Sequence, residues 1–238
     1  MRFRSSNPIL RNAERNIMTS DNAVTYSNVA FKTIFLVAIT GFVAYLMYFQ
    51  LQIFSLGYLI GAMIVGFISA IVGTRSVSLA PYFAVLYAAC EGIVLGMITI
   101  MLEVSYPGIA FTAISTTLIV LFIMMLLYST NIIKVNQKFA SFMVVALISI
   151  IVMSVFMLLT GLIGGSSVSS GLYLGIAVLS TIIAALYLFM DFENIKRCVE
   201  MGADTKYGWI LSLGLMVTLV WLYVEILRLL AIFARRNN

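Results

Sequence analysis

Seven long runs of apolar residues follow one another along the chain, separated by short polar connections. The runs cover residues 29–49, 54–72, 80–101, 109–129, 139–159, 171–190 and 208–233. A helix that crosses a membrane needs about 20 predominantly apolar residues, which is close to the length of each run. The pattern therefore predicts an all-α, polytopic membrane protein with seven transmembrane helices.

The polar segments at the two ends are short compared with this apolar part. Residues 1–28 are polar and basic. This segment is longer than the charged start of a cleavable signal peptide, so we interpret it as a retained tail. Residues 234–238 form a short carboxyl-terminal tail. The longest connection between apolar runs is predicted from Asp191 to Tyr207. We therefore expect one transmembrane bundle over residues 29–233 and no separate soluble domain.

Composition narrows the possible functions. The chain is 63% hydrophobic and 10% charged, so a lipid bilayer is its expected surrounding. Histidine is absent, which removes the usual imidazole general base and every histidine-containing metal site. An intramembrane aspartyl protease needs two aspartates within the membrane, and Asp191 is the one aspartate beside an apolar run. We therefore expect a protein that is not an enzyme.

The basic residues indicate an orientation. Lysine and arginine are retained on the cytoplasmic side of a membrane protein, and alternate connections place eleven of the 14 basic residues on the side of the amino terminus. The other three are Arg228, Arg235 and Arg236. With seven spans, this predicts a cytoplasmic amino terminus and a carboxyl terminus outside. The net charge of +5 is spread over the connections, so nucleic-acid binding is not expected.

The last apolar run carries a polar stripe. At 100° per residue, Thr218, Glu225 and Arg228 fall within an arc of roughly 80° together with Gly214 and Trp221. A charge that faces lipid costs several kcal/mol, so we expect this stripe to face the other helices. Glu225 and Arg228 are three residues apart, which leaves two interpretations open: a functional carboxylate, or an internal salt bridge near the outer membrane surface.

Two further acids lie in or beside apolar runs. Glu91 is close to the middle of its run and has no basic neighbour in sequence, so it is either protonated, paired across helices or wetted by a cavity. Asp191 ends the sixth run, on the same face as Ser180 and Tyr187. It is either a carboxylate that meets a polar group of the last run, or an ordinary solvated acid at a helix end.

Carboxyl groups that are buried at these positions can bind protons and cations. Burial and a second nearby carboxylate both favour the protonated form of a carboxyl group. An ionised carboxylate attracts hard cations, which prefer oxygen ligands, and protonation abolishes this attraction. The sequence therefore predicts a proton-gated or cation-selective path through the membrane.

Several segments, taken in order, resemble a known family. They are SSNPIL in the tail, APYFAVLYAACEGIVLG in the third run, YPGIAF before the fourth, DFENIKR after the sixth, and VWLYVEILRLLA in the last. Together they resemble the Bax inhibitor-1 family of seven-helix membrane proteins, specifically its bacterial YccA-like branch. The resemblance extends over nearly the whole chain.

The resemblance implies a bundle with a central seventh helix and a pH-sensitive calcium leak, controlled by a carboxylate pair between helices six and seven. The first carboxylate corresponds to Asp191. Aligning the leucine- and arginine-rich end of the last run places the second at Thr218, whereas matching acid to acid selects Glu225, about 10 Å farther along the helix. Asp191 and Glu225 are the implied calcium ligands, and calcium would bind transiently. Arg75 is the counterpart of an arginine that latches the pair.

The acids in the apolar runs and the resemblance together lead to two hypotheses for the function. The first is a passive calcium or cation leak in the bacterial inner (plasma) membrane, with Asp191 as gate, Arg75 as latch, and Glu91 and Glu225 as carboxylates within the path. The second, suggested by the YccA-like resemblance, is a regulator that transports nothing and binds a membrane-anchored ATP-dependent protease. No resident cofactor is expected, and nothing in the sequence predicts a particular oligomeric state.

Overall fold

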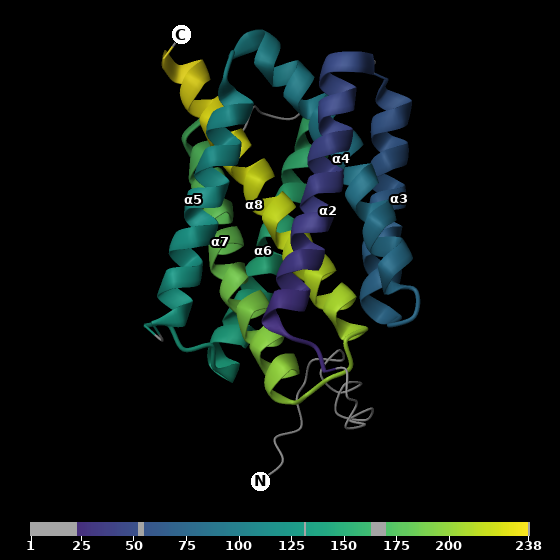
Figure 1. Cartoon of the computed structure of the whole chain (residues 1–238). Helices are drawn as coiled ribbons and strands as arrows, with labels where there is room; N and C mark the ends of the chain where they lie inside the picture. The colour runs from purple at the N-terminus through teal and green to yellow at the C-terminus, as the bar shows by residue number, and fades with distance from the viewer. Residues whose placement is uncertain (1–22, 52–54, 131, 163–169, 238) are drawn as a thin grey trace. The chain divides into compact units, whose positions relative to one another are not determined.

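The computed structural model describes residues 23–51, 55–130, 132–162 and 170–237, and within these ranges nearly all residues are helical (Figure 1). The elements are α2 (Tyr26–Leu46), a π-helical turn η1 (Met47–Leu51), α3 (Leu56–Arg75), α4 (Ala80–Ser105), α5 (Ile109–Ser129), α6 (Gln137–Leu162), α7 (Ser170–Glu200) and α8 (Tyr207–Asn237). Seven helical spans in these ranges are long and apolar enough to cross a membrane, which confirms the predicted fold class. Residues 1–22 of the predicted tail lie outside the described residues.

Local sequence signals mark the starts of four helices. The Thr25 side chain accepts a hydrogen bond from the Asn28 backbone N–H at the start of α2, and the Asn136 side chain accepts one from Phe139 at the start of α6. Pro81 lies in the first turn of α4, where its missing N–H costs nothing. Gly108 precedes α5 with φ of 83°, a left-handed conformation that glycine adopts without strain.

The predicted end of the sixth span was wrong. Helix α7 continues nine residues past Asp191 to Glu200, so the predicted connection from Asp191 to Tyr207 shortens to residues 201–206. Hydropathy falls at Asp191, but the next two turns are supported by an ion pair between Glu193 and Arg197, 2.7 Å apart. Gly202 follows the end of the helix, and its φ of 65° is typical of a left-handed C-terminal cap.

The described residues form two compact units. Unit 1 contains α2, η1, α3 and α4, together with residues 191–220 from the end of α7 and the start of α8. Unit 2 contains α5, α6, the remainder of α7, and α8 from Trp221 onward. Helix α8 thus supplies residues to both units. Of its most apolar 18 residues, 61% are buried, the largest share among the seven spans.

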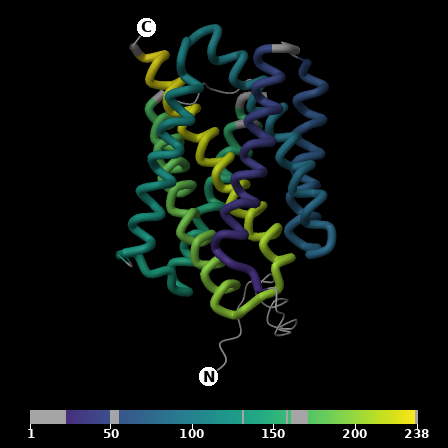
Figure 2. The backbone as a smooth tube through the Cα atoms, viewed as in Figure 1, coloured from purple at the N-terminus to yellow at the C-terminus, as the bar shows by residue number. Residues whose placement is uncertain are grey.

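In unit 1, α3 and α4 form an antiparallel pair and α2 lies along α4 (Figure 2). The core joins α2, α4 and α8 through six buried side chains. These are Leu36, Ala84, Tyr87, Ala88, Leu213 and Met216. A buried hydroxyl adds a polar contact, because Thr40 of α2 donates to the Ala88 carbonyl oxygen of α4 over 2.8 Å.

Two glycines set the distance between α2 and α4. A Cβ atom at Gly92 would lie 2.6 Å from the Cβ of Val43 and 2.8 Å from the Thr40 carbonyl oxygen. A Cβ atom at Gly96 would lie 2.7 Å from the Cβ of Met47. Both distances are shorter than real contacts, so small residues at this four-residue spacing let the two backbones approach closely.

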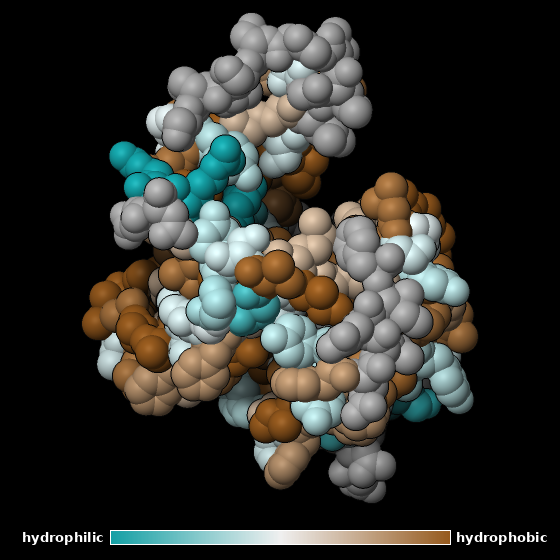
Figure 3. Space-filling model, turned by 90° about the horizontal axis from the view of Figure 1, so that it is seen from above, coloured by the Kyte–Doolittle hydropathy of each residue, from teal (hydrophilic) through white to brown (hydrophobic). Residues whose placement is uncertain are grey.

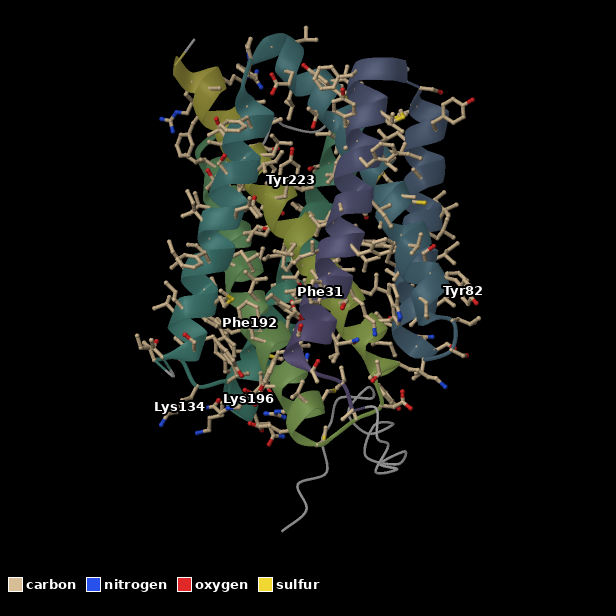
Figure 4. All side chains as sticks on the ribbon, in the orientation of Figure 1. Phe31, Tyr82, Lys134, Phe192, Lys196 and Tyr223 are labelled. Atoms are coloured by element: carbon tan, nitrogen blue, oxygen red, sulfur yellow. The ribbon has the colours of Figure 1, made fainter. Side chains whose placement is uncertain are left out.

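Unit 2 has its own packing centre. Phe189 of α7 is fully buried, and its ring lies 6.5 Å from the rings of both Tyr128 of α5 and Phe139 of α6. Large apolar side chains are exposed in both units. The view from above in Figure 3 shows hydrophobic residues at the surface, among hydrophilic ones. Phe31 and Tyr82, labelled in Figure 4, are 71% and 74% exposed. Such a surface suits acyl chains, as a membrane protein requires.

Candidate functional site

Asp191 and Thr218 meet in unit 1, where the end of α7 lies beside the start of α8. The Thr218 hydroxyl donates a side-chain hydrogen bond to the Asp191 carboxylate. The same hydroxyl oxygen is 3.4 Å from the Gly214 carbonyl oxygen, at the long limit for a hydrogen bond. Because a hydroxyl has one proton to donate, the carboxylate is its stronger acceptor. Of the two partners left open by the sequence, the structure therefore brings Thr218 to Asp191.

Both members of this pair are shielded from solvent at their polar atoms or side chains. Thr218 is 5% exposed. Asp191 as a residue is half-buried, yet its carboxyl oxygen Oδ2 is shielded and has no hydrogen-bond partner among the described residues. The charge of an ionised Asp191 resides on its carboxyl oxygens, so the shielding of Oδ2 sets the cost of ionisation. Burying an ionised carboxylate with one oxygen that lacks a hydrogen-bond partner costs several kcal/mol. This site therefore favours a proton, a cation or a water on Oδ2.

Glu225 belongs to a different cluster, in unit 2. It is 7% exposed, and its Oε1 accepts a hydrogen bond of 3.2 Å from Nε1 of Trp221. Its Oε2 forms an ion pair with Nη2 of Arg228, one turn farther along α8. The Tyr187 ring packs edge-on against Trp221, with 5.9 Å between centroids. Both carboxylate oxygens are thus occupied, and the arrangement is that of an internal salt bridge.

Glu91 is hydrogen-bonded within its own helix. The Tyr87 hydroxyl donates to the Glu91 carboxylate from one turn earlier in α4. The Glu91 side chain lies toward α3, where a Cβ atom at Gly66 would be 3.8 Å from its Oε1. Glu91 is half-buried. Its hydrogen bond supplies a neutral donor and no counter-charge.

Arg75 lies at the last position of α3 and is exposed. Among residues 23–51, 55–130, 132–162 and 170–237, no ion pair joins it to Asp191. Its role as a latch therefore stays a prediction. The same ranges contain no group of three or more acidic, cysteine or histidine residues placed to hold a metal ion, so a cation at Asp191 would depend on few protein ligands.

Sequence reasoning missed the aromatic donors of the two glutamates. Helical spacing placed Trp221 on the same stripe as Glu225, but it did not predict that Trp221 donates to Glu225, or that Tyr87 donates to Glu91. The signal was present in the sequence, because residues four apart face each other on a helix. An aromatic donor one turn before each buried acid satisfies one of its oxygens without adding charge to the membrane.

A family model described as Bax inhibitor 1 like matches residues 7–235. The chain belongs to the Bax inhibitor 1-like family. Comparison with curated proteins finds no match. In this family member, the acid that the resemblance implies on helix six lies against a threonine rather than against a second carboxylate. The described contact therefore joins one ionisable acid to one neutral hydroxyl.

Proposed function

We propose that this Bax inhibitor 1-like protein is a passive, pH-sensitive leak for cations, calcium among them, controlled at Asp191. The observation that carries the proposal is the shielded Asp191 carboxyl group, which has one oxygen on the Thr218 hydroxyl and the other without a partner among the residues that the structure describes. Such a shielded group has two states, one neutral and one negatively charged. A change in its protonation therefore has a large effect on what can pass.

The two states of Asp191 suggest how the leak is controlled. When the carboxyl group is protonated, it is neutral, and it offers a passing cation little attraction. When it is ionised, it attracts a hard cation, and the Thr218 hydroxyl is an additional oxygen ligand. Calcium prefers 6–8 oxygen ligands, so water would supply most of them, and binding would be weak enough to permit release. Calcium occupancy is therefore expected to fall as the pH falls.

The other acids have supporting roles in this proposal. Glu225 and Arg228 neutralise each other, so we assign them a bracing role in unit 2 rather than that of open calcium ligands. Glu91 remains a second candidate carboxylate, since its only described hydrogen bond comes from a neutral hydroxyl. We further propose a bacterial inner-membrane location, with the amino terminus in the cytoplasm, and a role that involves no enzymatic chemistry.

The alternative is a regulator of the YccA-like type that binds a membrane-anchored ATP-dependent protease. One observation favours it: the polar end of α7 presents charged side chains at its surface. In the pairs Lys196–Glu200 and Glu193–Arg197, between 19% and 61% of each side chain is exposed. Such a surface suits a partner protein, and in this alternative the buried acids would only stabilise the helices.

Flux through the purified wild-type protein distinguishes the two functions. In liposomes loaded with a calcium indicator, we expect a calcium leak severalfold above that of protein-free liposomes, and we expect it to decrease at acidic pH. Potassium flux and proton flux, measured in parallel, report the selectivity. Calcium entry equal to that of protein-free liposomes at every pH would remove the leak and favour the regulator.

A further inference from the structure

Lys32 joins the start of α2 to the connection that precedes α8. Its ammonium group donates to the Asn28 side-chain oxygen over 2.7 Å and to the Thr205 carbonyl oxygen over 2.9 Å. It also lies 5.2 Å from the centroid of the Trp209 ring, within the range of a cation–π interaction. Asp204 adds a negative charge nearby. A single side chain of α2 thus contacts both the α7–α8 connection and the first turn of α8.

Neighbouring contacts reinforce this junction. The Val24 N–H donates to the Ala203 carbonyl oxygen over 2.7 Å, just before α2 begins. The Ser212 hydroxyl donates to the Val29 carbonyl oxygen over 2.9 Å. A Cβ atom at Gly208 would lie 2.8 Å from the Lys32 ammonium nitrogen, so α8 begins in close contact with α2. We call Lys32 with Asn28, Thr205 and Trp209 the clasp.

The clasp continues into the core of unit 1 along α8. Trp209 packs partly buried against the cluster that contains Leu213 and Met216 of α8 and Leu36 of α2. Trp209, Leu213 and Met216 recur along α8 at spacings of four and three residues. One face of α8 therefore follows α2 for two turns. Thr218 lies on the same helix, nine residues after Trp209, or roughly 13 Å along the axis. A helix moves as a rigid element over such a distance, so displacement of its start also displaces Thr218.

We infer that the clasp sets the position of α8 and thereby holds the Thr218 hydroxyl on the Asp191 carboxylate. The clasp is a conformational device: while it is closed, α8 is fixed to α2, and when it opens, α8 is free to shift against α7. The inference concerns regulation of the site proposed above, and its effect on cation flux rests on that proposal. Its structural part, the coupling of Lys32 to Asp191, is measurable without flux.

The test uses the full chain in nanodiscs and liposomes, with Lys32→Met as the main variant. Methionine keeps the length of the side chain and removes its charge and donors. Lys32→Arg keeps charge and donors, and Lys138→Met removes an exposed lysine of α6 outside the clasp. If Lys32→Met does not fold, Asn28→Ala takes its place in the test, because this variant removes one acceptor of the clasp.

Two readouts report on the structure, and one reports on function. Hydrogen exchange follows the amides of residues 203–209, and the infrared carboxyl band of Asp191, assigned by its loss in Asp191→Asn, follows the bond from Thr218. In Lys32→Met we expect exchange in 203–209 to accelerate roughly tenfold or more, the effect of losing charge-assisted hydrogen bonds. We also expect a shifted Asp191 band and a shifted pH profile of calcium flux, with Lys32→Arg and Lys138→Met close to the wild type.

The outcomes separate the inference from the proposed function. If exchange accelerates but the Asp191 band does not move, Lys32 is only a local anchor and the inference fails. Unchanged exchange in 203–209 overturns it as well. If the band shifts in Lys32→Met but the wild type carries no calcium, the coupling holds and the proposed leak fails.

Discussion

Replacing Thr218 by aspartate is expected to turn the single-carboxyl site into an acidic pair that binds calcium about 10- to 100-fold more tightly. Two unit charges 4 Å apart interact by about 4 kcal/mol at an effective dielectric of 20, and 1.4 kcal/mol corresponds to a tenfold change in affinity. Part of this gain offsets desolvation and the repulsion between the two carboxylates. Calcium titration calorimetry at neutral pH measures the change directly.

The matched control is Thr218→Asn, which has the size of aspartate and no charge. We expect its calcium affinity to stay within a few-fold of the wild type. The acidic pair also releases two protons instead of one, so calcium binding by Thr218→Asp should depend more steeply on pH. Equal calcium affinity in the aspartate and asparagine variants would show that position 218 does not face the cation at Asp191.

Removing one partner of the Glu225–Arg228 pair is expected to be the most destabilising change at an ionisable residue. In Glu225→Gln, no counter-ion for Arg228 remains among the described residues. The Nε and Nη2 atoms of Arg228 are shielded, and neither has a hydrogen-bond partner among those residues. Breaking a buried ion pair costs about 3–5 kcal/mol. The Arg228 side chain is 29% exposed, so we expect about 3 kcal/mol, measured by unfolding in mixed micelles.

The double variant Glu225→Gln/Arg228→Met separates pairing from packing. It removes both charges, so we expect it to recover most of the lost stability. Glu200→Gln is the exposed control, because Glu200 pairs with Lys196 at the surface and such pairs contribute about 0–1 kcal/mol. If the double variant is no more stable than Glu225→Gln, the loss comes from the Trp221 contact or from packing, and the ion-pair account is wrong.

Hydropathy was sufficient to predict the seven spans, because lipid requires about 20 apolar residues wherever a helix crosses it. It did not predict where α7 ends. Beyond Asp191 the helix leaves the apolar pattern, and its length is then decided by the Glu193–Arg197 pair and by Gly202. The capping glycine was the available signal, and it lies eleven residues past the fall in hydropathy.

The candidate site was predictable in part. The polar stripe of the last span was found from helical spacing, but spacing alone did not decide whether Asp191 meets Thr218 or Glu225. That choice depends on how far α7 and α8 overlap, and the overlap is set by the length of α7 and by the short connection at residues 201–206. The clasp was not predicted, because Lys32 and Thr205 are 173 residues apart and local pattern carries no information on their contact.

The pH dependence of calcium flux in Asp191→Asn is the most direct test of the account. Asparagine keeps the size of the side chain and removes the charge that changes with pH, whereas Glu200→Gln removes an exposed carboxylate of the same helix. In liposomes we expect the wild type and Glu200→Gln to lose calcium flux as the pH falls, and Asp191→Asn to carry a low flux that does not respond to pH. If Asp191→Asn keeps the wild-type flux and the wild-type pH profile, Asp191 does not control the protein.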